Sequence, residues 1–561
     1  MMTTPRSSAP ATDFAALFVD ALVANGVRDV VLSPGSRSQA LALVVADRER
    51  SGTLRLHVRI DERVAGFVAL GLAVETQQPV VVVTTSGTAV ANLHPAVLEA
   101  HHSGVPLIIV SADRPLSLRG IGSNQTTQQP GIFANAVRAE WDVAAPTRDK
   151  PGDPAALAAA VVGAAVSGPV HVNVAFDVPL SGSVPAATAH DYAIAFADRQ
   201  GLPPALHLEP RPGTVVVAGT GAGPVAETTA RELGAPLLAE VTSGAHFGPN
   251  LVVAYRDLLN RANFGDRVER VIIFGHPTLS REVPALVQRD GVETIVVRSS
   301  ASIDDYNPGH RVARFADRVL VNGEPDASPA GRSWLGRWVT TSRAELEQHD
   351  APSIDIAISS EPADQAAFNR AVIAGLRAPV TRRALVEAVW RMTWPHDRLV
   401  VGASRLIREL DSYAPGKKIS VHANRGLAGI DGTISTALGI ARASQSAEGS
   451  TQQGITRVLL GDLALLHDAG ALLFGEGEPR PRIQIVVGND GGGTIFDGLE
   501  VAQTATSTDI DRVFLTKQVV DLEKLAAAYG WNYKRVENRG QLDEMLTPTN
   551  EPTIVEVPLA R

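Results

Sequence analysis

The chain has 561 residues and a formal net charge of −9. This length suits roughly three or four domains with their own cores, and the acidic balance argues against a general nucleic-acid or membrane-surface binder. The absence of cysteine excludes disulfides, thiolate nucleophiles, iron–sulfur clusters and cysteine-based zinc sites. Residues 1–12 are polar, and no run approaches the ~18 apolar residues of a membrane span. We therefore expect a cytoplasmic protein without a secretory signal or membrane segment.

The first third of the chain alternates β-branched apolar runs with helical periodicity. We expect strands at residues 27–32, 54–60, 80–84 and 107–110, each followed by a polar or glycine-rich loop. Strands that alternate with helices predict a parallel sheet covered on both faces, with ligands bound beyond the carboxyl ends of the strands. We assign residues 1–184 to an N-terminal domain with its ligand loops at that edge.

The rest of the chain predicts two further domains. A proline- and alanine-rich stretch at residues 181–213 predicts a linker. A second α/β block, with a helix around residues 334–347, predicts a middle domain at 213–350. A C-terminal domain follows at 364–561, with strands expected at 399–401, 418–421, 457–460, 483–487 and 554–557. The predicted fold is α/β, with three domains that are each a mostly parallel sheet covered by helices.

Two polar residues end neighbouring strands of the predicted C-terminal sheet. Asp462 follows the strand at 457–460, and Asn489 follows the next strand, one helix and one strand later. One carboxylate and one amide oxygen suit Mg²⁺, which usually keeps waters and substrate phosphate oxygens. The glycines 491–493 follow, where a backbone approaches a phosphate closely. Each residue alone is as typical of an ordinary turn, but the combination predicts a diphosphate–Mg²⁺ site.

This pattern resembles the thiamine-diphosphate (ThDP) enzymes, in which Gly-Asp-Gly is followed by Asn-Asn. Leu463 and Asp490 depart from that pattern, but residues 461–468 and 489–493 are similar to one branch, the family of 2-succinyl-5-enolpyruvyl-6-hydroxy-3-cyclohexene-1-carboxylate (SEPHCHC) synthases of menaquinone biosynthesis. Further motifs occur in the family's order: Ser33-Pro34-Gly35-Ser36-Arg37-Ser38, Asp61-Glu62-Arg63, Thr85-Ser86-Gly87-Thr88-Ala89-Val90-Ala91-Asn92, Ser111-Ala112-Asp113-Arg114-Pro115, Asn124-Gln125-Thr126, Asn424-Arg425-Gly426 and Gly429-Ile430-Asp431-Gly432-Thr433. The middle block matches least, with 277–281 as its one recognisable piece.

The resemblance implies ThDP and Mg²⁺, with Mn²⁺ as an alternative ion. It implies that Glu62 is the catalytic residue, which hydrogen-bonds the pyrimidine N1′ of the cofactor. Without the resemblance, Glu62 would be interpreted as an acid at a helix start, where the helix dipole favours it. It implies that Ile430, otherwise a core residue, supports the bent cofactor. The implied metal ligands are Asp462, Asn489 and the carbonyl of Gly491. The other implied cofactor-binding residues are Gly429, Gly432, Gly461, Gly492, Gly493, Ile495 and Phe496.

The family's substrates are 2-oxoglutarate, which is decarboxylated, and isochorismate, which accepts the remaining succinyl-semialdehyde unit in a 1,4-addition. Both are dicarboxylic, and arginine binds carboxylates through its planar fork. The residues that match substrate-binding positions are Ser36, Arg37, Arg114, Asn124, Gln125, Arg281, Ser404, Arg408 and Arg425. For any single arginine an exposed salt bridge is the commoner explanation. Arg405 shares the helix of Arg408, and the match favours Arg408.

The resemblance also implies that Glu62 and the Asp462–Asn489 pair come from different subunits. The protein would then be a homodimer or a dimer of dimers, with small molecules as partners and neither nucleic acid nor membrane.

Three alternatives stay open. The first is another ThDP-dependent 2-oxoacid decarboxylase or carboligase, which binds smaller acids and does not need five arginines. The second is a dinucleotide-dependent oxidoreductase, because residues 215–223 resemble a strand that enters a glycine-rich turn, although Pro224 stands where the third fingerprint glycine is expected. The third is a catalytically silent scaffold, against which Glu62, Asp462 and Asn489 argue.

Overall fold

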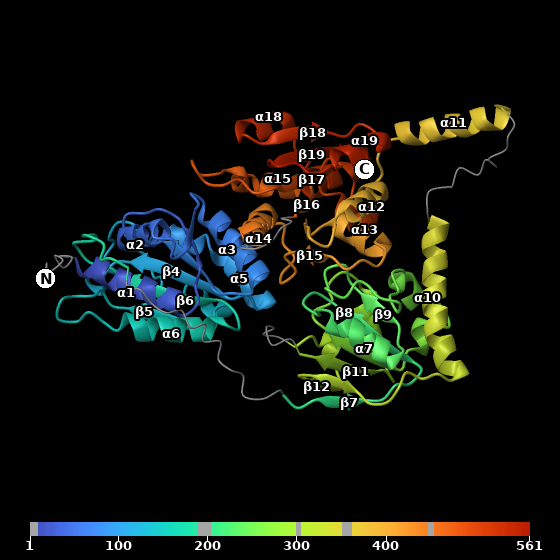
Figure 1. Ribbon diagram of the computed structural model, residues 1–561, viewed down its shortest axis with the longest axis horizontal. Helices are drawn as coiled ribbons and strands as arrows, with labels where there is room; N and C mark the ends of the chain where they lie inside the picture. The colour runs from blue at the N-terminus through green and yellow to red at the C-terminus, as the bar shows by residue number, and fades with distance from the viewer. Residues whose placement is uncertain (1–8, 188–202, 299–304, 350–361, 447–453) are drawn as a thin grey trace.

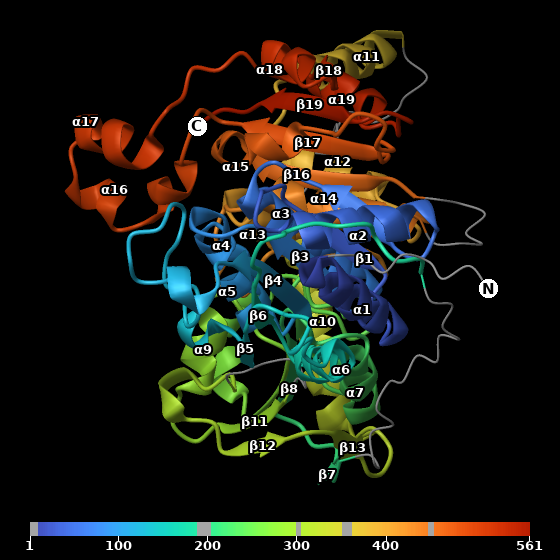
Figure 2. The ribbon, with the colours of Figure 1, turned by 90° about the vertical axis from the view of Figure 1, so that its left-hand side faces the viewer.

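The structure is a computed structural model that describes residues 9–187, 203–298, 305–349, 362–446 and 454–561. It contains three large sheets in separate parts of the chain (Figure 1). The N-terminal sheet lies at one side of the molecule, the middle sheet below, and the C-terminal sheet above them both (Figures 1 and 2). Every strand pair within these sheets is parallel, as expected for α/β layers.

The N-terminal sheet has six strands in the order β2-β1-β3-β4-β6-β5. Its strands are β1 (Asp29–Leu32), β2 (Arg55–Val58), β3 (Val80–Thr84), β4 (Leu107–Asp113), β5 (Glu140–Val143) and β6 (Val170–Ala175). Because side chains alternate along a strand, Val82 packs on one face and Val81 on the other. The first face carries α3 (Glu62–Thr76) and α5 (His94–Ser103); the second carries α1 (Pro10–Ala24), α2 (Gln39–Arg50) and α6 (Pro154–Ala165).

The C-terminal sheet has six strands in the order β15-β14-β16-β17-β19-β18. Its strands are β14 (Arg398–Val401), β15 (Ser420–His422), β16 (Thr456–Gly461), β17 (Ile483–Asn489), β18 (Asn532–Arg535) and β19 (Thr553–Pro558). Counted from its own first strand, this order repeats that of the N-terminal sheet. One face carries α12 (Arg382–Met392), α13 (Arg405–Tyr413) and α19 (Arg539–Met545); the other carries α14 (Thr433–Ser446), α15 (Asp462–His467) and α18 (Leu522–Ala528).

The N- and C-terminal layers share one apolar core through α3 and α14, which contact each other along their lengths. Glycines allow this close crossing. A Cβ atom on Gly71 would stand 2.0 Å from the carbonyl oxygen of Thr436, and one on Gly439 would stand 2.1 Å from that of Val68. The two helices therefore fix the N-terminal sheet against the C-terminal sheet within one chain.

The middle sheet has five strands in the order β12-β11-β10-β8-β9. They are β8 (Thr214–Ala218), β9 (Leu237–Ala239), β10 (Arg270–Phe274), β11 (Glu293–Val297) and β12 (Arg314–Ala316). The helices of this part are α7 (Val225–Leu233), α8 (Tyr255–Leu259), α9 (Glu282–Val287) and α10 (Pro329–His349). A separate two-stranded sheet pairs β7 (Leu206–Leu208) with β13 (Val319–Val321).

Some expectations need correction. Residues 206–208 were expected in a linker, but they form β7, because β13 supplies a partner more than a hundred residues away. The rest of that linker prediction includes residues 188–202, which lie outside the described residues. The helix expected around 334–347 is longer at both ends, as α10. A further helix, α11 (Pro362–Arg377), extends away from the rest of the molecule (Figure 1).

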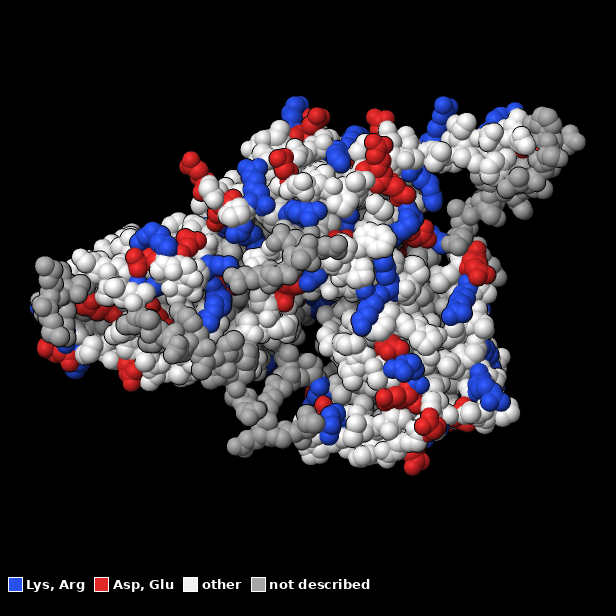
Figure 3. Space-filling model, viewed as in Figure 1, with Lys and Arg blue, Asp and Glu red and all other residues white. Residues whose placement is uncertain are grey.

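Shorter elements complete the described fold. They are α4 (Thr88–Ala91), α16 (Val501–Thr504), α17 (Ser507–Asp509), the 3-10 turns η1 (Leu116–Leu118), η2 (Ala134–Ala136), η3 (Gly265–Arg267), η4 (Pro308–His310), η5 (Ala469–Leu472) and η6 (Thr494–Gly498), and the π-helical turn η7 (Ile510–Leu515). Across the described parts of the chain, no helix has the length and apolarity needed to cross a membrane. Basic and acidic side chains are interspersed on the face shown in Figure 3.

Candidate active site

Asp462 and Asn489 lie side by side at the carboxyl edge of the C-terminal sheet. Gly461 ends β16 and pairs in register with Gly488 of β17, so the residues that follow them emerge together. Asp462 begins α15 and is only 6% exposed. The sheet therefore brings one carboxylate and one amide to the same point, as the sequence predicted from their spacing.

The environment of this pair fits a divalent cation. Burial raises the pKa of Asp462, and the nearby charge of Asp490 raises it further. Asp462 makes no ion pair with any described residue. The Nδ2 of Asn489 donates to Oε1 of Glu556 at 2.8 Å, which leaves Oδ1 as the amide's ligand atom. A hard ion would neutralise the buried carboxylate and accept the amide oxygen. No group of three or more His, Asp or Glu side chains that could hold a metal occurs among the described residues, so such an ion would also need backbone or phosphate oxygens.

The glycines after Asn489 are required by their surroundings. Gly491 and Gly492 have φ values of +79° and +130°, which side-chain-bearing residues rarely adopt. A Cβ atom on Gly492 would stand 2.1 Å from the carbonyl oxygen of Leu515, and one on Gly493 would stand 2.4 Å from that of Phe514. At Gly461, by contrast, no atom lies closer than 4.0 Å to a built Cβ, so there is open space above the strand end. Gly461 is therefore not closed off by a neighbouring side chain at this point.

Asp490, which replaces the usual asparagine, has a partner of its own. Its Oδ2 accepts hydrogen bonds from Nε and Nη2 of Arg382 at 3.1 and 2.8 Å, and from the hydroxyl of Thr494. Arg382 begins α12, so the departure from the usual motif is matched by a cation far away in the sequence. After Asp490, Ile495 and Phe496 lie in η6, and the ring of Phe496 lies 5.1 Å from that of Phe514.

Glu62 is the first residue of α3. Asp61 caps this helix by accepting from the N–H groups of Arg63 and Val64, which fixes the direction in which Glu62 leaves the helix start. Glu62 is half-buried, and Nδ2 of Asn92 lies 3.4 Å from its Oε2. Asn92 ends the motif at residues 85–92, but nothing in the sequence pairs it with Glu62.

The start of α3 lies beside the end of α15 within one chain. Arg63 donates to the carbonyl oxygen of His467 at 2.8 Å, and its Nη1 lies 3.2 Å from the Nδ1 of that histidine. The loop that carries Gly429 and Ile430 also approaches α3, because a Cβ atom on Gly432 would overlap the ring of Phe67. Ile430 itself is exposed. Within one chain, the end of α15 and the loop at Gly432 thus contact the first two turns of α3.

The first group of predicted substrate residues gathers on loops of the N-terminal sheet. Arg114 is buried and donates to the hydroxyl of Ser86 and to the carbonyl oxygen of Gln125 at 2.7 Å. Gln125 donates in turn to the carbonyl of Ser86 at 3.0 Å. Burial and the charge of Arg37 lower the pKa of Arg114, so the two guanidinium groups stand close together. Ser36 and Asn124 are exposed on the same loops. This concentration of positive charge suits an anionic ligand.

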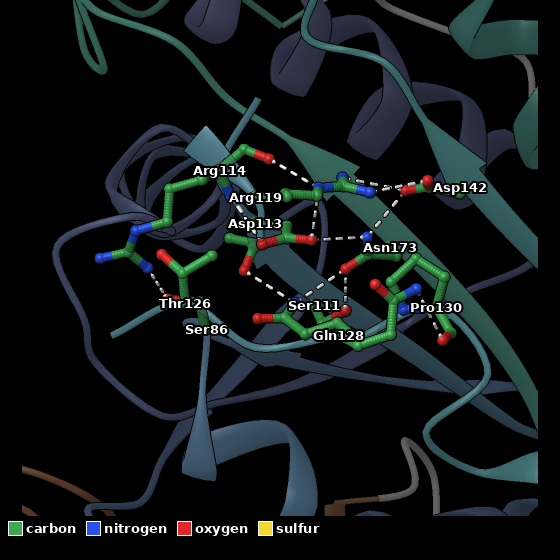
Figure 4. A network of polar contacts seen from close by, with 12 residues as sticks. Ser86, Ser111, Asp113, Arg114, Arg119, Thr126, Gln128, Pro130, Asp142 and Asn173 are labelled. Atoms are coloured by element: carbon green, nitrogen blue, oxygen red, sulfur yellow. Dashed lines mark hydrogen bonds and ion pairs between the residues drawn. The ribbon is translucent and has the colours of Figure 1, made fainter. Parts of the chain in front are cut away.

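A buried polar network lies behind Arg114 (Figure 4). Asp113 accepts from the backbone N–H of Arg114 at 2.7 Å and from Nδ2 of Asn173 at 3.0 Å. Arg119 bridges Asp113 and Asp142. In Figure 4 the side chain of Arg114 points away from this network toward Ser86. The network therefore anchors the loop, while Nη1 of the Arg114 guanidinium is held by Ser86 and Gln125.

The second group gathers in a groove between the middle and C-terminal sheets. Its cavity measures about 770 Å³ and includes Arg281, Arg408 and Ile495 among its lining residues. Arg405 also lines it but pairs with Glu409 at 3.6 Å. Among the described residues, the side chain of Arg408 donates only to the carbonyl oxygen of Ser404, at the start of its own helix, at 3.1 Å. Burial, Arg256 and Arg281 lower the pKa of Arg408. This geometry supports the preference for Arg408 over Arg405.

Arg425 is engaged differently from the other predicted arginines. It is buried, and its Nε and Nη2 donate to Oγ1 and the carbonyl oxygen of Thr278 at 2.9 and 3.2 Å. Burial lowers the pKa of Arg425, and the positive charge of nearby Arg408 lowers it further. Arg281, Arg408 and Arg425 therefore form one group, separate from Arg37 and Arg114; no contact joins the two groups in the described residues.

Several residues of these sites could not be found from the sequence. Arg256 lines the groove, Arg382 holds Asp490, and Glu240 accepts from the backbone N–H of Thr278, three residues before Arg281. None stands in a motif, and each comes from a segment distant in sequence from the residue that it contacts.

The glycine-rich turn after β8 does not have the geometry of a dinucleotide site. A Cβ atom on Gly219 would stand 2.1 Å from the backbone nitrogen of Pro277, and Thr220 forms a β-bridge with His276. The close backbone approach that Gly219 permits is thus made to this chain's own loop. This geometry argues against the oxidoreductase alternative.

Comparisons with known proteins identify the family of this chain. Residues 12–136 match the family described as thiamine pyrophosphate enzyme, N-terminal TPP binding domain. The sequence is 55% identical over 584 residues to the SEPHCHC synthase of Leifsonia xyli subsp. xyli, with 99% of this chain and 98% of that protein covered. It is 57% identical over 582 residues to the enzyme of that name from Clavibacter michiganensis subsp. michiganensis, with 100% and 98% covered. A relative of the same name from Kineococcus radiotolerans is 43% identical over 554 residues, with 96% and 94% covered.

The fold and the N-terminal match define the class of protein as a thiamine-pyrophosphate-dependent α/β enzyme. The full-length similarity defines the particular group: the chain belongs to the family of SEPHCHC synthases. The resemblance inferred from the ordered motifs is thereby confirmed, and the alternatives outside this family are not favoured.

Proposed function

We propose that this chain decarboxylates 2-oxoglutarate and joins the remaining four-carbon unit to isochorismate by 1,4-addition, with release of CO₂, in menaquinone biosynthesis. The observation that carries the proposal is the register pairing that sets Asp462 beside Asn489, with the glycine run directly after them. The names of the full-length relatives support the same reaction. We place the reaction in the cytoplasm.

The cofactor would be held at the carboxyl edge of the C-terminal sheet. Asp462, Oδ1 of Asn489 and the carbonyl of Gly491 would hold Mg²⁺ or Mn²⁺, and the open space above Gly461 would take the diphosphate. When bound, thiamine diphosphate supplies the electron sink that decarboxylation of a 2-oxo acid needs. Ile430 would support the bent cofactor, and Ile495 and Phe496 would lie beside it.

The chain's own residues would then move one proton and orient two dicarboxylic substrates. Glu62, which points from the start of α3, would hold a proton at the pyrimidine nitrogen N1′. Arg281 and Arg408 would bind a carboxylate in the groove, and Arg37 and Arg114 would bind another on the N-terminal loops. Ser36, Asn124, Gln125 and Ser404 would supply neutral hydrogen bonds.

The reaction can be tested directly. The purified protein is incubated with 2-oxoglutarate, isochorismate, thiamine diphosphate and Mg²⁺, and mass spectrometry follows the adduct while a coupled assay follows CO₂. We expect both products, and neither when one component is omitted. Pyruvate in place of 2-oxoglutarate is the matched control, because it lacks the distal carboxylate. Equal turnover of pyruvate would instead indicate a simpler decarboxylase or carboligase.

We also propose that the active enzyme is a homodimer or a dimer of dimers whose sites combine Glu62 of one subunit with Asp462 of another. Two inactive variants, Glu62→Gln and Asp462→Ala, test this proposal when they are mixed under conditions of subunit exchange. Each mixed dimer would regain one intact site, so about a quarter of all sites would recover by simple combinatorics. If both residues of a site come from the same chain, the mixture stays inactive.

A further inference from the structure

Glu240 lies at the junction between the middle sheet and α13, immediately after β9. It is only 2% exposed. Its Oε1 accepts hydrogen bonds from the backbone N–H groups of Thr278 at 2.7 Å and Leu279 at 2.6 Å. Its Oε2 has no hydrogen-bond partner among the described residues. One carboxyl oxygen therefore holds the short loop that leads to Arg281, while Glu240 itself does not line the groove.

The residue after Glu240 is tied to the opposite wall of the groove. The N–H of Val241 donates to Oδ1 of Asp411 at 2.8 Å, and Asp411 lies on α13, the helix of Arg408. Arg256 binds the other oxygen of Asp411 and also donates to the carbonyl of Arg408 at 3.2 Å. Two consecutive residues, 240 and 241, thus connect both arginine-bearing walls.

A third contact holds the same loop from the C-terminal side. Arg425 donates to Oγ1 and to the carbonyl oxygen of Thr278. Glu240 accepts from the N–H of Thr278 and Arg425 donates to its carbonyl oxygen, so the two peptide groups that flank this residue are each held. The position of Arg281, three residues further on, follows from that constraint.

The surroundings of Glu240 favour the neutral form of its carboxyl group. Burial, and then the charge of Asp411, raise the pKa of Glu240 to about 8, although the two N–H donors and Arg425 act in the opposite direction. Tyr255 and Arg256 on α8 and Tyr306 on the loop after β11 also face this cluster. A neutral acid next to Asp411 keeps its acceptor oxygen for the loop without adding a second buried charge.

We propose that Glu240 is a positioning residue for substrate recognition. It fixes the backbone of Thr278 and Leu279 so that Arg281 faces Arg408 across the groove, and it thereby sets the affinity for a substrate carboxylate. This inference rests on the proposed function, because it takes the groove to be a substrate site. Glu240 acts through Arg281 and takes no part in bond making.

The test combines amide hydrogen exchange with steady-state kinetics on the full-length enzyme. Glu240→Ala should speed exchange at Thr278 and Leu279 at least tenfold, raise KM for one dicarboxylic substrate about tenfold, and leave kcat within about twofold. Glu240→Gln keeps an acceptor oxygen of the same reach and should restore both readouts. Glu227→Ala, which removes another buried glutamate of the middle part, is the matched control and should change neither.

Unchanged exchange and unchanged KM in Glu240→Ala would overturn the proposal. If that variant does not fold, Glu240→Asp decides, because its side chain is one methylene shorter: it should speed exchange at Thr278 and Leu279 and raise KM, and unchanged values of both would refute the role. Arg281→Ala separates this inference from the proposed function. A raised KM in Arg281→Ala with a normal KM in Glu240→Ala refutes positioning alone, whereas normal KM values in both Arg281→Ala and Arg408→Ala refute the groove as a substrate site.

Discussion

Asp462 and Asn489 follow two glycines that face each other in register on the adjacent parallel strands β16 and β17. A sheet edge therefore places them together, although a helix and a strand separate them along the chain. The buried carboxylate of Asp462, with its raised pKa and the second acid Asp490 nearby, is destabilised as an anion until a cation binds. Both the binding of Mg²⁺ and the binding of the cofactor should therefore depend on Asp462.

We expect Asp462→Ala to abolish Mg²⁺-dependent binding of thiamine diphosphate. The diphosphate would lose its bridging ion, and affinity should fall by at least a hundredfold. Isothermal titration with the cofactor, in Mg²⁺ and in EDTA, measures the effect. Glu556→Gln, which alters only the residue behind Asn489, should weaken binding less. Tight binding that persists in EDTA would show that Asp462 is not a metal ligand.

We expect Glu62→Gln to bind the cofactor normally but to lose activity. An amide at the start of α3 fills the same space and cannot hold the required proton at N1′. Exchange of the C2 proton of bound thiamine diphosphate, followed by NMR, should slow by orders of magnitude. Asn92→Ala is the matched control, because the Nδ2 of Asn92 makes a long hydrogen bond of 3.4 Å to Oε2 of Glu62 and its loss leaves the carboxyl group in place. Wild-type exchange in Glu62→Gln would remove Glu62 from catalysis.

We expect Arg408→Ala to raise KM for a dicarboxylic substrate by about ten- to a hundredfold, because a charge-assisted hydrogen bond contributes ~1.5–3 kcal/mol. Arg405→Ala is the control from the same helix and should have a smaller effect, since Arg405 already pairs with Glu409. Affinity for thiamine diphosphate should stay nearly constant in both. The reverse pattern, with lost cofactor binding and normal KM, would assign these arginines to the cofactor.

We expect Arg425→Ala also to raise KM for a dicarboxylic substrate, in part because Arg425 holds the loop that leads to Arg281. Arg425 holds Thr278, so its loss should also speed amide exchange in the loop before Arg281. Arg408→Ala should leave that exchange unchanged. Equal exchange in the two variants would show that Arg425 acts on the substrate alone.

The pH dependence of stability should differ between the wild type and Glu240→Gln. The folded chain raises the pKa of Glu240 to about 8 from an ordinary 4.5, so it binds this proton more tightly than the unfolded chain does. The free energy of unfolding contributed by this group therefore falls as pH rises through that window and is lowest above pH 8. Glutamine does not ionise, so the stability of Glu240→Gln relative to the wild type should increase between about pH 4.5 and 8 and level off above pH 8. Thermal unfolding at several pH values measures this difference, and parallel curves for the two proteins would contradict it.

The sequence predicted the parts of the fold in which apolar pattern and packing agree. The buried runs at β3, β16 and β17 were expected almost at their final bounds, because a strand covered on both faces must be apolar throughout. β18 was not expected, since its pattern is polar and half-exposed at the sheet edge. The boundaries of the three domains, and the assignment of site residues, stay predictions.

The same distinction holds for the candidate site. Asp462 and Asn489 were predicted from their spacing at two strand ends, whereas the role of Glu62 was predicted from the family resemblance. Glu240, Arg256 and Arg382 could not be found in that way. Their roles come from contacts across the middle and C-terminal layers, and a charged residue in a loop gives no local sign of its distant partner.

The sequence by itself determined the α/β class, the family and the residues at strand ends, because strand pattern and motif spacing are local and parallel strands always deliver their carboxyl ends to one edge. Only the tertiary structure decided that the arginines divide into two groups, that Arg425 holds Thr278, and that Glu240 stands behind Arg281. These depend on how separate layers pack, and burial and close charges give a side chain its partner only once those layers have met.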